Sequence, residues 1–356
     1  MQSVRNWDVI IVGGGIIGLS LAIELRKQQA RVLIVERGEP GREASHAAAG
    51  MLADCMMETP AALQTLATAS ARMYPEFVHE LQDESGIKVD LRDNGTILFL
   101  ASKNATDGAD FSGEQLPPAA FAELDPDVAV YERPAIYLKE RSVDPRALTL
   151  AALKGAKHRE VDIASGTVVT EVLVSDGRTV GVNTARATYN APVVVNCAGA
   201  WAGQLGPHQF PTRPVKGQML SVVGGPKIRH VIRTPEVYLV PRSDGRILIG
   251  ATVEDAGYDK RVDAETIQRL HDAAVGLVPA LAQARRHEVW AGLRPGTPDD
   301  LPILGATATL GYFIATGHFR DGILLAPVTA RAMAQIITGE EPGYHLAAFS
   351  PGRFQI

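Results

Sequence analysis

The chain has 356 residues, of which 46% are hydrophobic, and a formal net charge of −5, so we expect two domains with a sizeable core. No block of lysines and arginines appears, and nucleic acid is therefore not an expected partner. The two cysteines, Cys55 and Cys197, form no disulfide or metal-binding pattern, which fits a reducing cytoplasm.

The first predicted element is an apolar strand, 9–12, which leads through a glycine-rich turn into an apolar helix, 16–27. The turn and helix start read Gly13-Gly14-Gly15-Ile16-Ile17-Gly18. Gly13 permits a tight turn, Gly15 lets the backbone approach a pyrophosphate, and Gly18 lets the helix pack close to the strand. The pyrophosphate would then lie at the positive end of the helix.

A second strand, 31–35, ends at Glu36. This acid follows the glycines by about twenty residues, where a carboxylate accepts hydrogen bonds from both ribose hydroxyls of a dinucleotide. Arg37 would suit a 2′-phosphate, but Glu36 would repel it, so NADP is not expected. The apolar stretch 9–25 is short, rich in glycine and fully explained as strand, turn and helix, so no membrane segment is expected.

The segment 41–52 consists largely of small residues. It is either a loop that lets the backbone approach a ligand or the start of an alanine-rich helix. A polar helix to about Gly86 should follow, then a strand at 95–100. Residues 102–130 are rich in Pro, Asp and Ala, which predicts a loop with a short helix.

The next predicted helix runs from 143 to about 158, and a hairpin of strands 166–174 and 179–183 should follow it. Residues 193–197 form a continuous apolar run, typical of a strand buried on both faces. This strand should end in the tight turn Ala198-Gly199-Ala200-Trp201, where a ligand would meet the backbone.

Strands dominate 219–252, including a hairpin formed by residues 237–241 and 246–251. A helix at 263–278 and a strand at 288–293 come next. Strand 312–315 then leads into a turn that contains Arg320, and the last helix, 323–338, stops at Gly339.

Parallel-sheet segments thus lie at the start, middle and end of the chain, and hairpin-rich segments lie between them. This pattern predicts an α/β (α+β two-domain) protein with a discontinuous nucleotide domain. The expected nucleotide domain comprises residues 1–85, 143–215 and 288–356. The substrate domain should comprise 86–142 and 216–287.

Six motifs together resemble the D-amino-acid oxidase superfamily of FAD-dependent oxidoreductases, and within it the glycine oxidase group of bacterial thiamine biosynthesis. They are Gly13 to Gly18, Glu36, Ala48-Ala49-Gly50-Met51-Leu52, Val195 to Trp201, Gly292-Leu293-Arg294-Pro295-Gly296-Thr297 and Gly317 to Pro327. The resemblance spans essentially all of the chain. It implies non-covalent FAD and a Rossmann-like FAD-binding domain with an inserted antiparallel-sheet substrate domain, as in p-hydroxybenzoate hydroxylase.

The resemblance also implies the reaction and its partners. The expected reaction is oxidative deamination of glycine, sarcosine or a small D-amino acid by molecular oxygen, which yields the 2-oxo acid, ammonia and hydrogen peroxide. The expected partners are therefore a small amino-acid or amine substrate and oxygen, and a homo-oligomer, tetramer or dimer, is compatible with the resemblance.

Carried over position by position, the resemblance implies both a cofactor shell and a substrate shell. The expected substrate contacts, of which the first three are also the catalytic residues, are Arg294, Tyr238, Arg320 and Met51. The expected FAD contacts are Gly13, Gly14, Gly15, Ile16, Ile17, Gly18, Glu36, Arg37, Ala44, Ser45, Ala49, Gly50, Met51, Val168, Ala198, Gly199, Trp201, Arg320, Asp321, Gly322, Ile323, Leu324, Leu325 and Ala326. No metal is expected.

Each proposed role has a plainer alternative. Arg294 suits a substrate carboxylate because a guanidinium is planar and always charged, but an arginine also makes structural salt bridges. Tyr238 is either a hydrogen-bond donor to the carboxylate or a core tyrosine, and Met51 is a pocket wall or core packing. Arg320 precedes the last helix, whose positive end would favour anionic reduced flavin. His318 is not expected to be a base, because a substrate that enters as the neutral amine needs none.

Two departures from the family pattern stand out. The family often has Asn where this chain has Asp321, and no cysteine lies near Gly292, where related sarcosine oxidases attach FAD covalently. Three other functions stay open at this point. They are an FAD-dependent dehydrogenase that passes electrons to a quinone or a partner protein, an NAD-dependent dehydrogenase, and a non-catalytic subunit with a flavoprotein fold.

Overall fold

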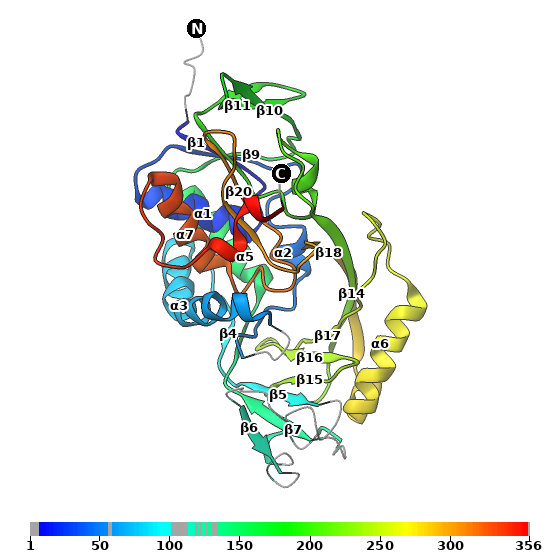
Figure 1. The fold of residues 1–356 in the computed structure, drawn as a ribbon. Helices are drawn as coiled ribbons and strands as arrows, with labels where there is room; N and C mark the ends of the chain where they lie inside the picture. The colour runs from blue at the N-terminus through cyan, green and yellow to red at the C-terminus, as the bar shows by residue number, and fades with distance from the viewer. Residues whose placement is uncertain are drawn as a thin grey trace.

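The computed structural model describes residues 7–55, 59–100, 113–117, 120, 123–125, 127–129 and 134–354. The molecule is built around two sheets, and Figure 1 shows the long strands β14 (Arg213–Val223) and β18 (Arg285–Gly296) running from one part of the molecule to the other. In the described ranges, none of the helices combines the length and apolar character that a membrane crossing needs.

The first sheet has six strands in the order β19-β20-β13-β1-β2-β9. Their bounds are β1 Val9–Val12, β2 Val32–Val35, β9 Asp162–Ala164, β13 Val193–Asn196, β19 Ile303–Ala306 and β20 Tyr312–Thr316. All pairs are parallel except β19 with β20. β1 lies between β2 and β13 and is buried throughout, as its unbroken apolar sequence predicts. The strands next to it therefore come from early and middle parts of the chain.

Helices from distant segments gather beside this sheet (Figure 1). They are α1 (Ile16–Lys27), α3 (Ala61–Ser85), α5 (Pro145–His158) and α7 (Ala326–Thr338). Their apolar side chains form the largest buried cluster together with β1 and β2. Asp144 caps α5 by accepting hydrogen bonds from the backbone of Arg146 and Ala147.

The second sheet has eight strands in the order β18-β14-β17-β16-β15-β5-β7-β6. The bounds of its other strands are β5 Thr96–Phe99, β6 Gly113–Leu116, β7 Ala135–Leu138, β15 Val231–Arg233, β16 Tyr238–Pro241 and β17 Ile247–Gly250. Helix α6 (Ala264–Leu277) packs along one face of this sheet (Figure 1), with Leu270 and Leu277 in its core. The opposite face is free to line a cavity.

Short elements complete the described chain. They are α2 Ala44–Ala47, β3 Met51–Leu52, β4 Leu91–Arg92, β8 Arg141–Val143, β10 Val169–Ser175, β11 Arg178–Thr184, β12 Thr188–Asn190, and 3-10 helices at Gly199–Gln204, Pro279–Gln283, Ala347–Phe349 and Pro351–Phe354.

Most predicted elements are present, and the differences have physical reasons. The small-residue segment 41–52 contains both alternatives, since α2 is helical and the residues after it form a loop and β3. β18 is longer than the predicted strand 288–293 because it pairs with β14 over nearly its whole length. β6 was not predicted in 102–130, and residues 101–112 lie outside the described chain.

The expected division into two domains stays a proposal. Residues 288–296 were assigned to the nucleotide domain, but they belong to β18, which pairs with β14 in the eight-stranded sheet. We therefore propose that the last boundary of the substrate domain lies after Gly296.

Candidate active site

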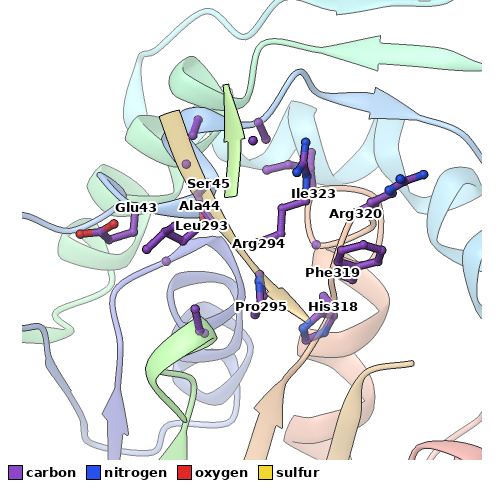
Figure 2. Close-up of a pocket in the computed structure, with 18 of the residues that line it drawn as sticks. Glu43, Ala44, Ser45, Leu293, Arg294, Pro295, His318, Phe319, Arg320 and Ile323 are labelled. Atoms are coloured by element: carbon purple, nitrogen blue, oxygen red, sulfur yellow. The ribbon is translucent and has the colours of Figure 1, made fainter. Parts of the chain in front are cut away.

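A cavity of about 800 Å³ lies between the two sheets. The glycine turn after β1 lines one end of it, and Tyr238, Arg294 and Arg320 line the other. Figure 2 shows Arg294 on its strand and, beside it, the turn that carries His318, Phe319 and Arg320. The cavity thus connects the predicted nucleotide residues with the predicted substrate residues.

The glycines of the turn are required by their surroundings. Gly13 has a φ of +112°, and a Cβ there would overlap the carbonyl oxygen of Cys197. A Cβ on Gly18 would overlap the carbonyl oxygen of Gly13, so only glycine lets α1 pack this closely against β1. Gly15 lines the cavity directly. This geometry suits a pyrophosphate held against the start of α1.

Glu36 is buried at the end of β2 and holds the turn in shape. Its Oε2 accepts a hydrogen bond from the backbone N–H of Gly14 at 2.8 Å, and its Oε1 accepts one from Gly38 at 2.8 Å. Ser45 of α2 accepts a hydrogen bond from the Ile16 N–H at 3.0 Å, at the first residue of α1. Glu36 also lines the cavity, at the end where the sequence predicts the ribose.

Aromatic side chains lie beside this nucleotide end. The guanidinium of Arg37 lies over the Trp201 ring at 4.4 Å, and Trp201 stacks on Tyr258 at 5.3 Å. Arg37 is thereby held over an aromatic ring, which argues against its use as a 2′-phosphate partner.

Two side chains of α3 hold the turn between β20 and α7 in place. Ser70 donates a hydrogen bond to the carbonyl of Leu324 at 2.6 Å, and the Tyr74 hydroxyl donates one to the carbonyl of Ile323. Both side chains are fully buried. The sequence analysis did not find them, although a serine and a tyrosine four residues apart on the apolar face of α3 were a usable signal.

His318 lies in the same turn and has a structural environment. It is buried, its Nε2 lies 3.1 Å from the Thr329 hydroxyl, and burial lowers its pKa to about 3. It is therefore neutral near pH 7, and its one hydrogen-bonding nitrogen is directed at α7 rather than at a substrate.

The loop before β3 is held by a residue that sequence reasoning missed. Arg242, buried next to β16, donates a hydrogen bond to the carbonyl of Ala49. Burial lowers its pKa to about 10. The loop in turn places Met51 against the cavity, where it packs near Tyr238.

Arg294 and Tyr238 meet at the substrate end. Nη1 of Arg294 donates to the carbonyl of Thr252 at 3.1 Å, and burial lowers the pKa of this guanidinium. Burial raises the pKa of Tyr238, and the nearby Arg294 opposes that rise. The tyrosine hydroxyl therefore stays protonated and able to donate a hydrogen bond beside a fixed cation.

Arg320 and Asp321 form the other side of this end. Arg320 is exposed, and its guanidinium lies 5.3 Å from the ring of Phe319. Burial raises the pKa of Asp321 to about 6, and Arg320 and Arg233 oppose the rise. Asp321 is thus partly protonated in mildly acidic solution, unlike the asparagine of the family pattern.

Most of the residues predicted to contact the cofactor line the cavity. These are Gly13, Gly15, Ile16, Ile17, Glu36, Arg37, Ala44, Ser45, Ala49, Gly50, Met51, Val168, Ala198, Gly199, Trp201, Arg320, Asp321, Gly322 and Ile323. Five predicted cofactor contacts are absent from the lining, namely Gly14, Gly18, Leu324, Leu325 and Ala326. The backbone of Gly14 donates a hydrogen bond to Glu36, and Gly18 lets α1 pack on β1. The other three residues are buried between α3 and α7. Direct cofactor contact by each residue stays a prediction.

A glycine turn, a buried acid after the second strand and a cavity that ends at a half-buried arginine define a dinucleotide-dependent oxidoreductase. The sequence model of the FAD dependent oxidoreductase (DAO) family matches residues 8–336, and the chain belongs to this family. FAD is accordingly the cofactor. The cavity fits it, because Gly13, which has no room for a Cβ, and Gly15 line the end where a pyrophosphate is expected, and Glu36 lines the same end after β2.

Relatives of this family match nearly the whole chain. It is 34% identical to the bifunctional protein ThiO/ThiG of Trichormus variabilis over 98% of this chain, but spans only 55%, about half, of that relative's length. It is 34% identical to the glycine oxidase of Geobacillus kaustophilus, with 97% of each chain covered. The crystal structure of a glycine oxidase from that organism matches with a TM-score of 0.93 at 33% identity, covering 98% of this chain and 99% of the other.

Another relative is named for a different function. The hydrogen cyanide synthase subunit HcnC of Pseudomonas aeruginosa is 31% identical over 99% of this chain and 97% of its own length. The family and fold are therefore shared by proteins whose names differ in function.

Proposed function

We propose that the protein is an FAD-dependent amine oxidase that deaminates glycine or a similar small amino acid, such as sarcosine or a small D-amino acid. The products are the 2-oxo acid, hydrogen peroxide and ammonia, with methylamine in place of ammonia when sarcosine is the substrate. The observation that carries the proposal is the half-buried Arg294 beside Tyr238, in the same cavity as the glycine turn. The similarity to glycine oxidases supports it.

Arg294 is the proposed carboxylate clamp. A buried guanidinium needs anionic or hydrogen-bonding partners, and its planar fork matches the two oxygens of a carboxylate. The hydrogen bond from Nη1 to the Thr252 carbonyl fixes the plane of that fork. Tyr238 and Arg320 then contribute a donor and a second positive charge around the same substrate, and Met51 forms the wall.

Bound FAD supplies the electron acceptor for a hydride from the α-carbon of the substrate. The protein orients that carbon by holding the carboxylate on Arg294. His318 is a weak base, because burial lowers its pKa to about 3, and its Nε2 is occupied by the Thr329 hydroxyl. The proposal therefore has the substrate react as the neutral amine.

A role in thiazole synthesis for thiamine is part of the proposal. The relatives named ThiO/ThiG support it, although this chain covers about half of their length. The cytoplasmic location and the homo-oligomer, tetramer or dimer, stay predictions.

The second candidate function is a dehydrogenase that passes electrons to a quinone or a partner protein. The similarity to HcnC, which is named as a subunit of hydrogen cyanide synthase, supports only the possibility of a partner protein. Peroxide measured during aerobic turnover of the isolated chain decides between the two candidates. Flavin reduction by an amino acid without peroxide in air would support the dehydrogenase.

The direct test of the clamp is Arg294→Ala. A hydrogen bond to a charged group contributes roughly 1.5–3 kcal/mol, so we expect kcat/KM for the best amino acid to fall at least about tenfold, and Arg294→Lys to restore part of it. The flavin absorbance of the purified variant controls for loss of FAD. Full efficiency in an FAD-loaded Arg294→Ala enzyme would contradict the proposal.

A further inference from the structure

Arg233, at the end of β15, faces the same cavity as Tyr238. The two residues are directly opposite each other in the antiparallel pair of β15 and β16, so their side chains lie on the same face of the sheet. Arg233 lines the cavity, and only 8% of its surface is exposed. A third arginine therefore joins Arg294 and Arg320 at the substrate end.

The internal partner of Arg233 leaves it incompletely satisfied. Its Nη1 lies 3.5 Å from Oε2 of Glu140, a residue that is 2% exposed. Nevertheless, among the residues that the structure describes, Nη1 has no hydrogen-bond partner. A buried guanidinium normally has its donors satisfied. Nη1 lies on the Glu140 side and has almost no accessible surface, so the 3.5 Å contact with Glu140 balances the charge of Arg233 incompletely. A ligand oxygen would reach this charge through the part of the side chain that lines the cavity.

The charges around the substrate end point to an anion. Among the residues that the structure describes, the charged side chains that line it are three arginines, Arg233, Arg294 and Arg320, and two acids, Glu236 and Asp321. Burial raises the pKa of Asp321 to about 6, so its negative charge weakens in mildly acidic solution. A substrate with one carboxylate occupies Arg294 and leaves Arg233 without a counter-ion from the ligand.

We propose that Arg233 binds a second carboxylate of the substrate, so that this enzyme prefers amino acids with an acidic substituent over glycine. The inference rests on the proposed amine oxidase function and specifies its substrate class. The second carboxylate is carried either on the amino nitrogen, as in N-carboxymethylglycine, or on the α-carbon side chain, as in D-aspartate. In both cases Tyr238 lies next to the bound molecule, because it is opposite Arg233 and beside Arg294.

Matched substrates test the preference in the holoenzyme. N-carboxymethylglycine is compared with sarcosine, and D-aspartate with D-alanine, since each pair differs by one carboxylate. We expect kcat/KM at least about tenfold higher for one of the two diacids than for its partner, chiefly through KM. The pair that shows the difference identifies where the second carboxylate is attached. Equal or lower efficiency for both diacids overturns the inference.

Variants separate binding from a structural role of the ion pair. Arg233→Met keeps the length and apolar stem of the side chain, and we expect it to bring the diacid-to-monoacid ratio to about one. Arg233→Lys should retain part of the ratio. Glu140→Gln should raise the ratio, because it removes the competing carboxylate. An unchanged ratio in Arg233→Met, or an equal loss for all substrates, overturns the inference.

Binding of non-reacting acids makes the test independent of turnover. Malonate and acetate are titrated into the FAD-loaded enzyme, and the flavin absorbance reports each Kd. We expect malonate to bind at least about tenfold more tightly than acetate, and Arg233→Met to remove the difference. If no amino acid reduces the flavin, the proposed function fails while this titration still decides the role of Arg233. Equal malonate and acetate affinities in the unmodified enzyme overturn the inference.

Discussion

The guanidinium of Arg294 lies directly over the backbone of Gly217 on the neighbouring strand β14. A Cβ added at Gly217 would lie 2.5 Å from both Nη1 and Nη2 of Arg294. Tyr238 has the same relationship with Gly250 of β17, where an added Cβ would lie 2.7 Å from the phenol ring. Two glycines in the sheet therefore make room for the two side chains proposed to bind the carboxylate.

We predict that Gly217→Ala displaces Arg294 without unfolding the protein, because the atoms that have to move are the end of a flexible side chain. KM for the best substrate should rise at least about tenfold, the loss of one charged hydrogen bond. Steady-state kinetics on FAD-loaded enzyme measure this. Gly343→Ala is the matched control, because a Cβ there meets nothing within 4 Å. An unchanged KM in Gly217→Ala would mean that substrate binding does not depend on the place that the Arg294 guanidinium occupies over Gly217.

FAD should be held without a covalent bond. Of the chain's two cysteines, Cys197 lines the cavity, and burial raises the pKa of its thiol to about 12, so it is not a reactive thiolate at neutral pH. After acid precipitation the yellow colour should appear in the supernatant. Colour that stays in the pellet would contradict this prediction.

The enzyme should distinguish the two hands of a chiral substrate. With the carboxylate on Arg294, only one face of the α-carbon can direct its hydrogen toward the cofactor while the side chain lies in free space. The resemblance to D-amino-acid oxidases indicates that the accepted hand is D. An oxygen electrode should detect turnover of D-alanine and negligible turnover of L-alanine, and a preference for the L form would show that the orientation is wrong.

His318 should make the folded state sensitive to acid. In the unfolded chain a histidine gains a proton below about pH 6.5, whereas burial keeps His318 neutral in the folded protein until about pH 3. Because the unfolded state then binds more protons, the free energy of unfolding falls as the pH drops from about 6.5 toward 3. The thermal midpoint of His318→Gln should fall less over this range than that of the unmodified protein.

The control for this pH series is His158→Gln, because His158 is exposed at the end of α5. Its thermal midpoint should follow the unmodified protein at each pH. If the thermal midpoint of His318→Gln also follows that of the unmodified protein at each pH, burial does not keep the His318 ring neutral.

The nucleotide end of the site was readable from the sequence because its information is local. Gly13, Gly18 and Glu36 are specified by spacing within one strand, turn and helix, and the structure gives each of them the surroundings that spacing implies. The parallel sheet was likewise predicted from continuous apolar runs. Substrate residues such as Arg294 and Tyr238 were named only through the family resemblance.

The supporting contacts were not readable because they join distant parts of the chain. Ser70 binds the carbonyl of a residue 254 positions away, and Arg242 binds one 193 positions away. Nothing in the local sequence around Arg233 indicates a cavity, since Glu140 and Tyr238 reach it only through the sheet order. Such contacts depend on strand register, which periodicity does not specify.

The order of strands in the parallel sheet also affects when the cofactor can be acquired during synthesis. β1 leaves the ribosome first, its neighbour β13 emerges only after β5, β6 and β7 of the other sheet, and β20 emerges only after all the strands of that sheet. The cavity lacks the turn that carries Arg320 and Asp321 until the segment 312–325 has been translated. We therefore expect ribosome-bound chains stalled before this segment to capture no flavin, so that FAD loading follows translation rather than guiding it.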